Sequence, residues 1–258
     1  MLYASLISWL FLVVLQLYKG QLKQTLTCWK DYPHALLFGA INPFIYYLML
    51  LKAYTLLPAQ EAQILNYTWA LTMTLLAIPL LGHKPGRFDI VAAVLCYLGV
   101  VVIATRGDLL NLEFGSLMGV GWALLSTVIW ALYWLLNTRH NHDPMAGLLR
   151  NFTCALPMIV VYCVVTKTPL IISWQGFSGA LYIGLFEMGI SFVCWQMAMR
   201  LTESTARIAN LIFIAPLLSL VIISVILKEP ILSSTLWGMV LILGGLMTQQ
   251  MFSKEKQA

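Results

Sequence analysis

Long apolar stretches alternate with short polar gaps along almost the whole chain. A helix needs about 20 apolar residues to cross the hydrocarbon core of a bilayer. Lipid offers backbone polar groups no hydrogen-bond partner, so each such stretch is expected to be helical. Nine stretches are long enough or nearly so: 2–18, 34–53, 60–81, 88–105, 115–137, 147–166, 176–199, 207–228 and 233–252. The pattern predicts an all-α polytopic membrane protein with about nine transmembrane helices.

The composition agrees with this pattern. Of 258 residues, 60% are hydrophobic and 10% are charged, and the mean hydropathy is +0.85. A typical soluble domain is about 45–50% apolar and about 25% charged. The five cysteines form no CxxC pair, and four lie in apolar runs, where a free thiol behaves as a small hydrophobe. The sequence "RHNHD" at 139 has no recognised ligand spacing, so we expect no disulfide framework, metal site or cofactor.

Basic residues are distributed unevenly between the two sets of alternate gaps. One set, together with the C-terminal tail, holds 11 of the 15 Lys and Arg residues, and the other holds Lys52, Arg106, Lys167 and Lys228. Cytoplasmic loops carry an excess of Lys and Arg, which predicts a cytoplasmic C-terminus and, with nine spans, an external N-terminus. Topology therefore accounts for the net charge of +5, and no nucleic-acid partner is expected.

The second half of the chain resembles the first half when it is shifted by 145 positions. The matches are Ala53 with Ala198, Leu56 with Leu201, Pro85 with Pro230, Gly99 with Gly244, and Asn42 with Glu187. The gap at Lys84 and the matched gap at Lys228 fall on opposite sides of the membrane, so the two halves run in opposite directions. Such inverted repeats are common in secondary transporters, whose solutes bind near the midplane of the bilayer.

The repeat predicts how the chain is divided. A first repeat of four spans, 1–106, is N-terminally incomplete, a second repeat of five spans covers 114–253, and 254–258 form a cytoplasmic tail. The partner of the 115–137 span would precede Met1, so we expect a ten-helix ancestor whose first helix is missing here. Gly238, Gly244 and Gly245 in the last span are expected to permit close helix packing.

Four parts of the chain carry a further signal: "NYTWALTMTLLAIPLLGHKP" at 66, "STVIWALYWLLNTR" at 126, "FEMGISFVCWQMAMRLTESTARIANLIFIAPLLSLVIISVILKEP" at 186 and the glycine-bearing closing spans. These segments resemble the EamA-type permeases of the drug/metabolite transporter superfamily, which are built from two inverted five-helix repeats. "NYTWA" is similar to the "NYLWP" pattern of bacterial aromatic amino-acid exporters, with Ala70 in place of proline. The resemblance implies a multi-pass protein of the bacterial inner membrane that transports small metabolites, with outward transport expected.

Glu187 is the residue most in need of explanation, because it is the one carboxylate placed deep inside an expected span. A charged side chain at the bilayer centre costs at least about 2.5–3.5 kcal/mol, and ionisable residues there are candidates for functional sites. The functional interpretation is a contact for a solute ammonium group or a proton site. The structural interpretation is a protonated side chain that hydrogen-bonds a neighbouring helix. The sequence leaves both open.

Further polar and aromatic side chains follow one face of several expected spans. Positions four apart lie on one side of a helix, as Glu187, Ser191 and Trp195 do, and Asn42 and Tyr46 repeat this spacing in the matched span. The remaining candidates for substrate binding are Gln63, Asn66, Trp130, Tyr133, Asn137 and Asn210. Together these groups predict a polar, aromatic-walled cavity for a small solute, although each stripe alone could serve helix–helix packing.

Three classes of function fit the sequence to different degrees. A secondary transporter, exporting amino acids or related amphipathic compounds, fits best. A non-transporting or truncated membrane subunit is the alternative, because a half-repeat leaves the midplane site without its full inverted pair. An enzyme is not expected, since HExxH, GxSxG and a phosphate loop are all absent. The solute and membrane lipid are the expected partners, and the oligomeric state, a monomer included, is left open.

Overall fold

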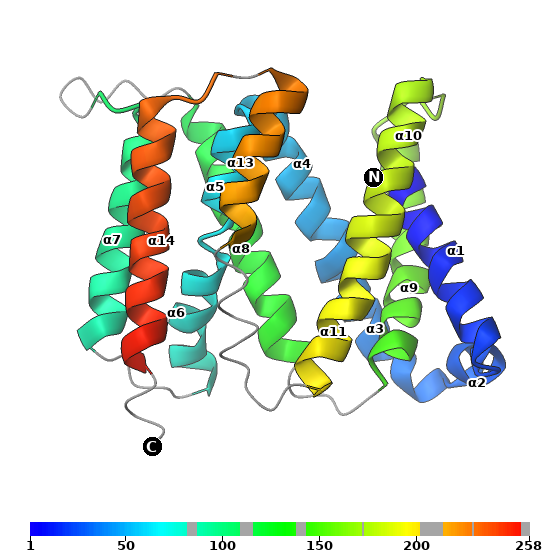
Figure 1. The fold of residues 1–258 in the computed structure, drawn as a ribbon. Coiled ribbons are helices and arrows are strands. Elements are labelled where there is room, and N and C mark those ends of the chain that lie inside the picture. Colours follow the sequence, from blue (N-terminus) through cyan, green and yellow to red (C-terminus); the bar gives the residue numbers. More distant parts are fainter. Residues whose placement is uncertain are drawn as a thin grey trace. The chain divides into compact units, whose positions relative to one another are not determined.

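The computed structural model describes residues 1–81, 87–108, 116–137, 143–171, 173–201, 214–228 and 230–253. These ranges are helical and contain no β-strand (Figure 1). Five helices are long and apolar enough to cross a membrane: Trp29–Leu56, Arg87–Ala104, Leu117–Leu136, Met145–Val165 and Trp174–Trp195. Shorter apolar helices cover Leu2–Tyr18, Ala215–Leu227 and Ser233–Thr248. The prediction of an all-α polytopic membrane protein is confirmed.

Helices occupy the described part of every expected span. In the first half of the chain they are α1 (Leu2–Tyr18), then α3 (Tyr32–Gly39), η2 (Ala40–Ile45) and α4 (Tyr46–Leu56), which follow one another without a gap, then α5 (Ala59–Asn66), α6 (Trp69–Leu81) and α7 (Arg87–Ala104). The second half has α8 (Leu117–Asn137) and α9 (Pro144–Val165), then α10 (Trp174–Tyr182), η3 (Ile183–Ser191) and α11 (Phe192–Leu201), again without a gap. The last two are α13 (Ile214–Leu227) and α14 (Ser233–Ser253). Two further short helices, α2 (Leu22–Thr27) and η1 (Trp29–Asp31), lie between α1 and α3.

The expected span at 60–81 is not one helix but two. α5 ends at Asn66, and α6 begins at Trp69 after a two-residue turn. The hydroxyl of Thr68 donates to the carbonyl of Leu65 at 2.8 Å. A threonine side chain that bonds to a nearby carbonyl competes with the helical ladder, and hydropathy alone does not reveal this.

The chain forms two compact units, and each unit takes helices from both expected repeats. Unit 1 comprises Met1–Leu48 and Arg139–Ile208, and unit 2 comprises Met49–Thr138 and Ala209–Ala258. Unit 1 therefore contains α1, α3, η2, α9, α10, η3 and α11. Unit 2 contains most of α4, together with α5 to α8, α13 and α14.

In unit 1, α1 packs antiparallel to α9. The hydroxyl of Tyr3, near the start of α1, donates to the carbonyl of Leu170 beyond the end of α9, and the indole N–H of Trp9 donates to Thr153 at 2.9 Å. Shifting α1 by 145 positions places it on α9, so the two helices are repeat partners that run in opposite directions, as an inverted repeat requires.

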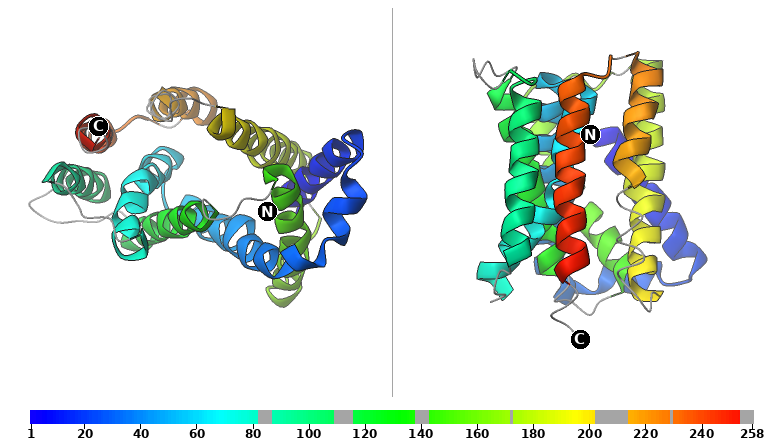
Figure 2. Two further views of the ribbon diagram at one scale, coloured as in Figure 1. Left: turned by 90° about the horizontal axis from the view of Figure 1, so that it is seen from below. Right: turned by 60° about the vertical axis from the view of Figure 1, so that its left-hand side comes forward.

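Unit 2 shows the same relation between α7 and α14, which lie side by side in Figures 1 and 2. Small residues allow this close approach. A Cβ added at Gly99 would lie 2.6 Å from the carbonyl oxygen of Gly238, and one at Gly245 would lie 2.8 Å from that of Ala92. The packing role predicted for Gly238 and Gly245 is confirmed, whereas a Cβ at Gly244 would meet nothing within 4 Å. The prediction for Gly244 is wrong because this residue points away from α7.

Candidate functional site

The helix that carries Asn42 is interrupted at this residue. Asn42 has φ −145° and ψ 120°, which are extended rather than helical values. Pro43 causes the interruption, because proline lacks an N–H and excludes the helical conformation from the residue before it. The helix resumes after this kink within η2, where the N–H of Tyr46 bonds to the carbonyl of Ile41. Asn42 is 2% exposed, and its Oδ1 has no hydrogen-bond partner among the described residues.

Glu187 lies in the second π-helical segment of unit 1, η3. Its Oε1 accepts a hydrogen bond of 3.0 Å from the hydroxyl of Tyr47, at the start of α4. Glu187 is otherwise exposed. The carboxyl group thus has one hydrogen-bond partner inside unit 1.

The irregular segments η2 and η3 occupy matched places in the repeat. Shifting Ala40–Ile45 by 145 positions gives residues 185–190, which fall inside Ile183–Ser191. The irregularity differs in kind, because η2 contains a kink at the extended Asn42, whereas η3 is a π-helical segment, a form that occurs frequently at functional sites. Both members of the matched pair, Asn42 and Glu187, therefore lie where the regular α-helix is interrupted.

A tyrosine that the sequence analysis did not select contacts Glu187. The i, i+4 spacing from Asn42 led to Tyr46 as a candidate for substrate binding, but the residue that bonds Glu187 is the next one, Tyr47. Because the helix is kinked at Asn42, the regular spacing of four does not apply across η2. Tyr46 is buried and packs edge-on against Tyr47, with the ring centroids 4.9 Å apart.

The remaining candidates of unit 1 lie further along the same helix as Glu187. Ser191 ends η3 and is exposed, and Trp195 in α11 is half-buried. The candidates Asn66 and Tyr133 belong to unit 2. The bond that the structure gives Glu187 is to an aromatic hydroxyl within its own unit.

Unit 2 holds the other candidates in two groups. Gln63 of α5 accepts a hydrogen bond from the hydroxyl of Tyr54 in α4, and Asn66 ends α5. Trp130 and Tyr133 of α8 form an aromatic cluster with Trp69 and Trp134, whose ring centroids lie 5.6–6.5 Å from those of their neighbours. Asn137 is the last residue of α8, and its side chain lies outside the described part of the structure, as does all of Asn210.

A separate apolar groove of about 620 Å³ lies within unit 2. Its lining comes from Thr72 of α6, Tyr97 of α7 and residues of α8 between Met118 and Val128. The predicted site residues are not among those that line it. The hydroxyl groups of Thr72 and Thr127 are 3.0 Å apart, and each can instead donate to a carbonyl of its own helix, that of Thr68 for Thr72 and that of Leu124 for Thr127.

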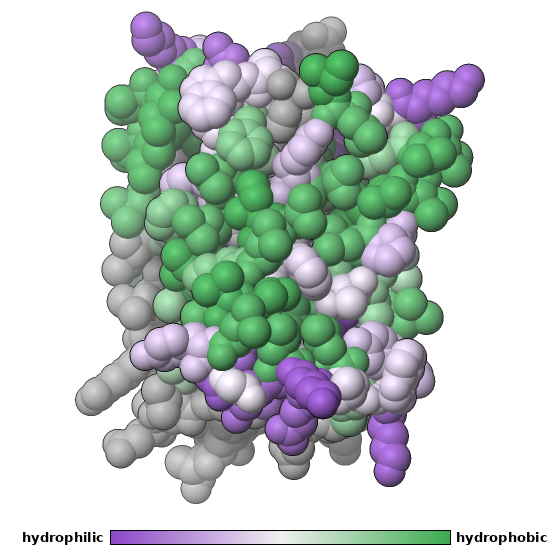
Figure 3. Space-filling model, turned by 90° about the vertical axis from the view of Figure 1, so that its right-hand side faces the viewer, coloured by the Kyte–Doolittle hydropathy of each residue, from purple (hydrophilic) through white to green (hydrophobic). Residues whose placement is uncertain are grey.

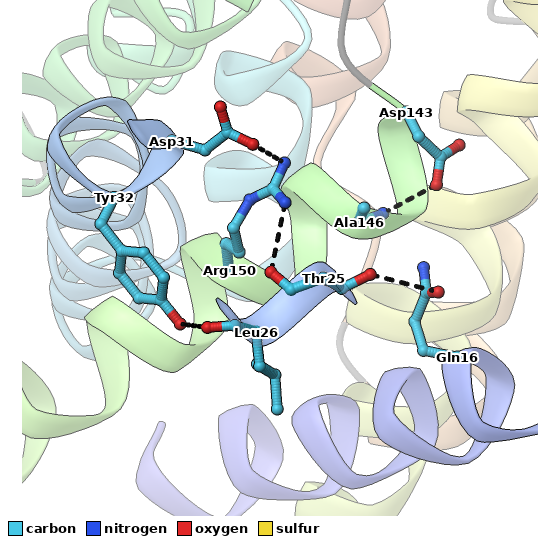
Figure 4. Close-up of polar contacts among 8 residues, drawn as sticks. All are labelled: Gln16, Thr25, Leu26, Asp31, Tyr32, Asp143, Ala146 and Arg150. Carbon is cyan, nitrogen blue, oxygen red and sulfur yellow. Dashed lines mark hydrogen bonds and ion pairs between the residues drawn. The ribbon is translucent and has the colours of Figure 1, made fainter. Parts of the chain in front are cut away.

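Two charged contacts were not predicted from the sequence. Arg150, counted there as a topology signal, is 5% exposed and pairs with Asp31 at 2.9 Å (Figure 4). Glu61 of α5 is 3% exposed, and its Oε1 lies 3.6 Å from the Nε of Arg106. The signal for Arg150 was its position three residues inside the expected 147–166 span. In the part of the chain that the structure describes, His, Cys, Asp and Glu form no group that could hold a metal ion.

The fold and its paired helices are those of an all-α polytopic membrane protein. The model of the EamA-like transporter family matches residues 1–105 and 117–248, and the chain belongs to this family. An uncharacterized transporter of Bacillus subtilis (strain 168), YvbV, is 25% identical over 264 residues, covering 98% of this chain and 82% of that protein. A protein of known crystal structure shares the fold, with a TM-score of 0.67 at 20% identity over 100% of this chain and 88% of the other.

Proposed function

We propose that this protein is a secondary transporter that exports small amino-bearing metabolites, such as amino acids or related amphipathic compounds, across the bacterial inner membrane. The orientation that goes with this proposal has the C-terminus in the cytoplasm. The observation that carries it is the Glu187–Tyr47 pair, on a π-helical segment whose repeat match holds the buried Asn42. The proposal of a transporter rests on membership of a transporter family, and the proposal of an amino-bearing solute rests on these residues.

The site favours a solute that donates hydrogen bonds and carries positive charge. A carboxylate attracts an ammonium group, and a charge-assisted hydrogen bond is roughly twice as strong as a neutral one. The Oδ1 atom of Asn42 is a second acceptor, buried and unpartnered among the described residues. Leaving such an atom unsatisfied costs about 1–3 kcal/mol. A solute donor or a water molecule that reaches Asn42 would remove this cost.

Glu187 can also couple solute movement to a proton. The hydroxyl of Tyr47 donates to the carboxylate when Glu187 is ionised, and the same pair can stay in contact when Glu187 is protonated. A solute ammonium and a proton would then compete for one carboxyl group. Since the sequence contains no phosphate loop, transport would be driven by an ion gradient or by the gradient of the solute itself.

Transport by the purified protein in liposomes tests the proposal. Radiolabelled amino acids and related amines would be supplied one at a time, with and without a pH gradient, and protein-free liposomes would set the background. The expected result is flux of at least one amino-bearing solute that depends on the protein. Solutes of the same size without an amino group are the control, and we expect them to move at the background rate.

Two results would count against this function. Flux of solutes without regard to the amino group would remove the role given to Glu187 in recognition. Background flux for the whole panel, with the protein folded and with either pH condition, would favour the alternative of a non-transporting membrane subunit.

A further inference from the structure

The connection between α1 and α3, residues 18–34, carries a concentrated positive charge. This segment, called the basic arm below, contains α2 and η1 and exposes Lys19, Lys23 and Lys30. Asp31 is its one acidic residue. The arm therefore presents three ammonium groups within a short length of chain.

The basic arm lies where the apolar faces of two helices end. α1 exposes Val14 and Leu17 up to its last turn, at 61% and 58%, and α3 exposes Leu36 at 52% just after the arm. Between them, Tyr18 is 92% exposed and Trp29 is 79% exposed. Exposed tyrosine and tryptophan are typical of the level of the lipid headgroups. Figure 3 shows the apolar belt on this side of the molecule giving way to hydrophilic residues at its lower end, where Figure 1 places α2.

A buried ion pair removes the negative charge of the arm and fixes the arm to α9. Arg150 of α9 pairs with Asp31 at 2.9 Å and also donates to the carbonyl of Thr25 at 3.3 Å (Figure 4). Within the arm, the hydroxyl of Tyr32 donates to the carbonyl of Leu26 at 3.0 Å, which ties the start of α3 to α2. Because Asp31 is neutralised by Arg150, it does not compete for the three exposed lysines.

We propose that the basic arm binds the headgroup phosphates of anionic phospholipids. Lysine is a common phosphate ligand and offers three donors per ammonium group. Its attraction to an anionic membrane surface amounts to about a fivefold gain in binding per residue, and about a hundredfold for three, at low ionic strength. The flanking apolar faces place the lysines beside lipid, and the charge of the arm selects anionic over zwitterionic headgroups.

Two triple variants test this proposal. Lys19→Gln, Lys23→Gln and Lys30→Gln together remove the charge of the arm. The matched control replaces Lys52, Lys167 and Lys228 with Gln, since these three lysines are also exposed but lie outside the arm. Each protein is placed in nanodiscs of phosphatidylglycerol or phosphatidylcholine, its thermal unfolding is followed, and native mass spectrometry counts the phosphatidylglycerol molecules it retains.

The wild-type protein and the control triple should retain phosphatidylglycerol and unfold at a higher temperature in it than in phosphatidylcholine, because a ligand that binds the folded state stabilises it. The arm triple should retain at least tenfold less phosphatidylglycerol than the wild-type protein. Its unfolding temperature should be the same in phosphatidylglycerol as in phosphatidylcholine. A third variant with Arg at the three arm positions keeps the charge and should retain the lipid.

Equal loss in both triples, or no preference for phosphatidylglycerol in the wild-type protein, would overturn the proposal. So would a dimer that dissociates in the arm triple, which would assign the arm to contact with a second copy. If the arm triple fails to fold, Lys30→Gln alone provides the comparison, with an expected loss of about fivefold. Unchanged lipid retention in that variant would also contradict the proposal.

Discussion

Two adjacent glycines in α14 should respond in opposite ways to the same substitution. An added Cβ at Gly245 would lie 2.7 Å from the Sγ of Cys96 and 2.8 Å from the carbonyl oxygen of Ala92, whereas one at Gly244 would meet nothing within 4 Å. Overpacking of this kind costs about 1–3 kcal/mol, and part of the strain at Gly245 falls on backbone that cannot rotate away. Replacement of Gly by Ala inside a helix gains up to about 1 kcal/mol.

The free energies of unfolding of the two variants should therefore differ by about 1–3 kcal/mol, with Gly245→Ala less stable than Gly244→Ala. For a chain of this size each kcal/mol moves the unfolding midpoint by roughly 2–4 °C, so the midpoints should lie about 2–12 °C apart. Thermal unfolding of the purified variants, followed by the fluorescence of the nine tryptophans, measures this difference. Equal midpoints, or a Gly244→Ala variant less stable than Gly245→Ala, would refute the packing of α7 against α14 described above.

Two other substitutions test the contacts of unit 1. Arg150→Met removes the buried cation that pairs with the half-buried Asp31, so we expect a loss of about 1–3 kcal/mol in unfolding free energy, whereas the exposed Arg87→Met should change it by less than about 1 kcal/mol. A stability of Arg150→Met equal to that of Arg87→Met in chemical denaturation would contradict the buried ion pair. Tyr47→Phe removes the hydroxyl donor to Glu187, and kcat/KM for transport should fall about tenfold at unchanged yield, corresponding to roughly 1.5 kcal/mol. Unaltered transport kinetics would show that this hydrogen bond does not act in transport.

The positions of the spans could be predicted from hydropathy, because the bilayer sets both the length and the helical form of each segment. The 145-residue offset also led to Asn42 and Glu187, which the structure places at matched interruptions of the α-helix. Which tyrosine contacts Glu187 did not follow from the sequence, because the kink at Asn42 breaks the regular spacing of four residues.

The burial of charged side chains near the ends of the spans could not be predicted from the hydropathy pattern. Arg150 and Asp31 were assigned to a cytoplasmic boundary from their place in the sequence, but the short helices α2 and η1 bring them together within unit 1. Such a contact depends on where a connecting segment folds back, and neither hydropathy nor the Lys and Arg distribution specifies that. Gly244 illustrates the same limit, since its match with Gly99 in the repeat did not make it a packing residue.

The central claim is that the carboxyl group of Glu187 takes part in transport. Glu187→Gln keeps the shape of the side chain and a hydrogen-bond acceptor for Tyr47, but it removes titration. The control is Asp108→Asn, the same chemical change at an exposed position after α7. The measurement is the pH dependence of solute flux in proteoliposomes for the wild-type protein and both variants. Glu187→Gln should fold and insert normally but show reduced flux or a flattened pH dependence, while Asp108→Asn follows the wild type. Normal flux of Glu187→Gln at every pH would contradict the account and leave Glu187 a purely structural role.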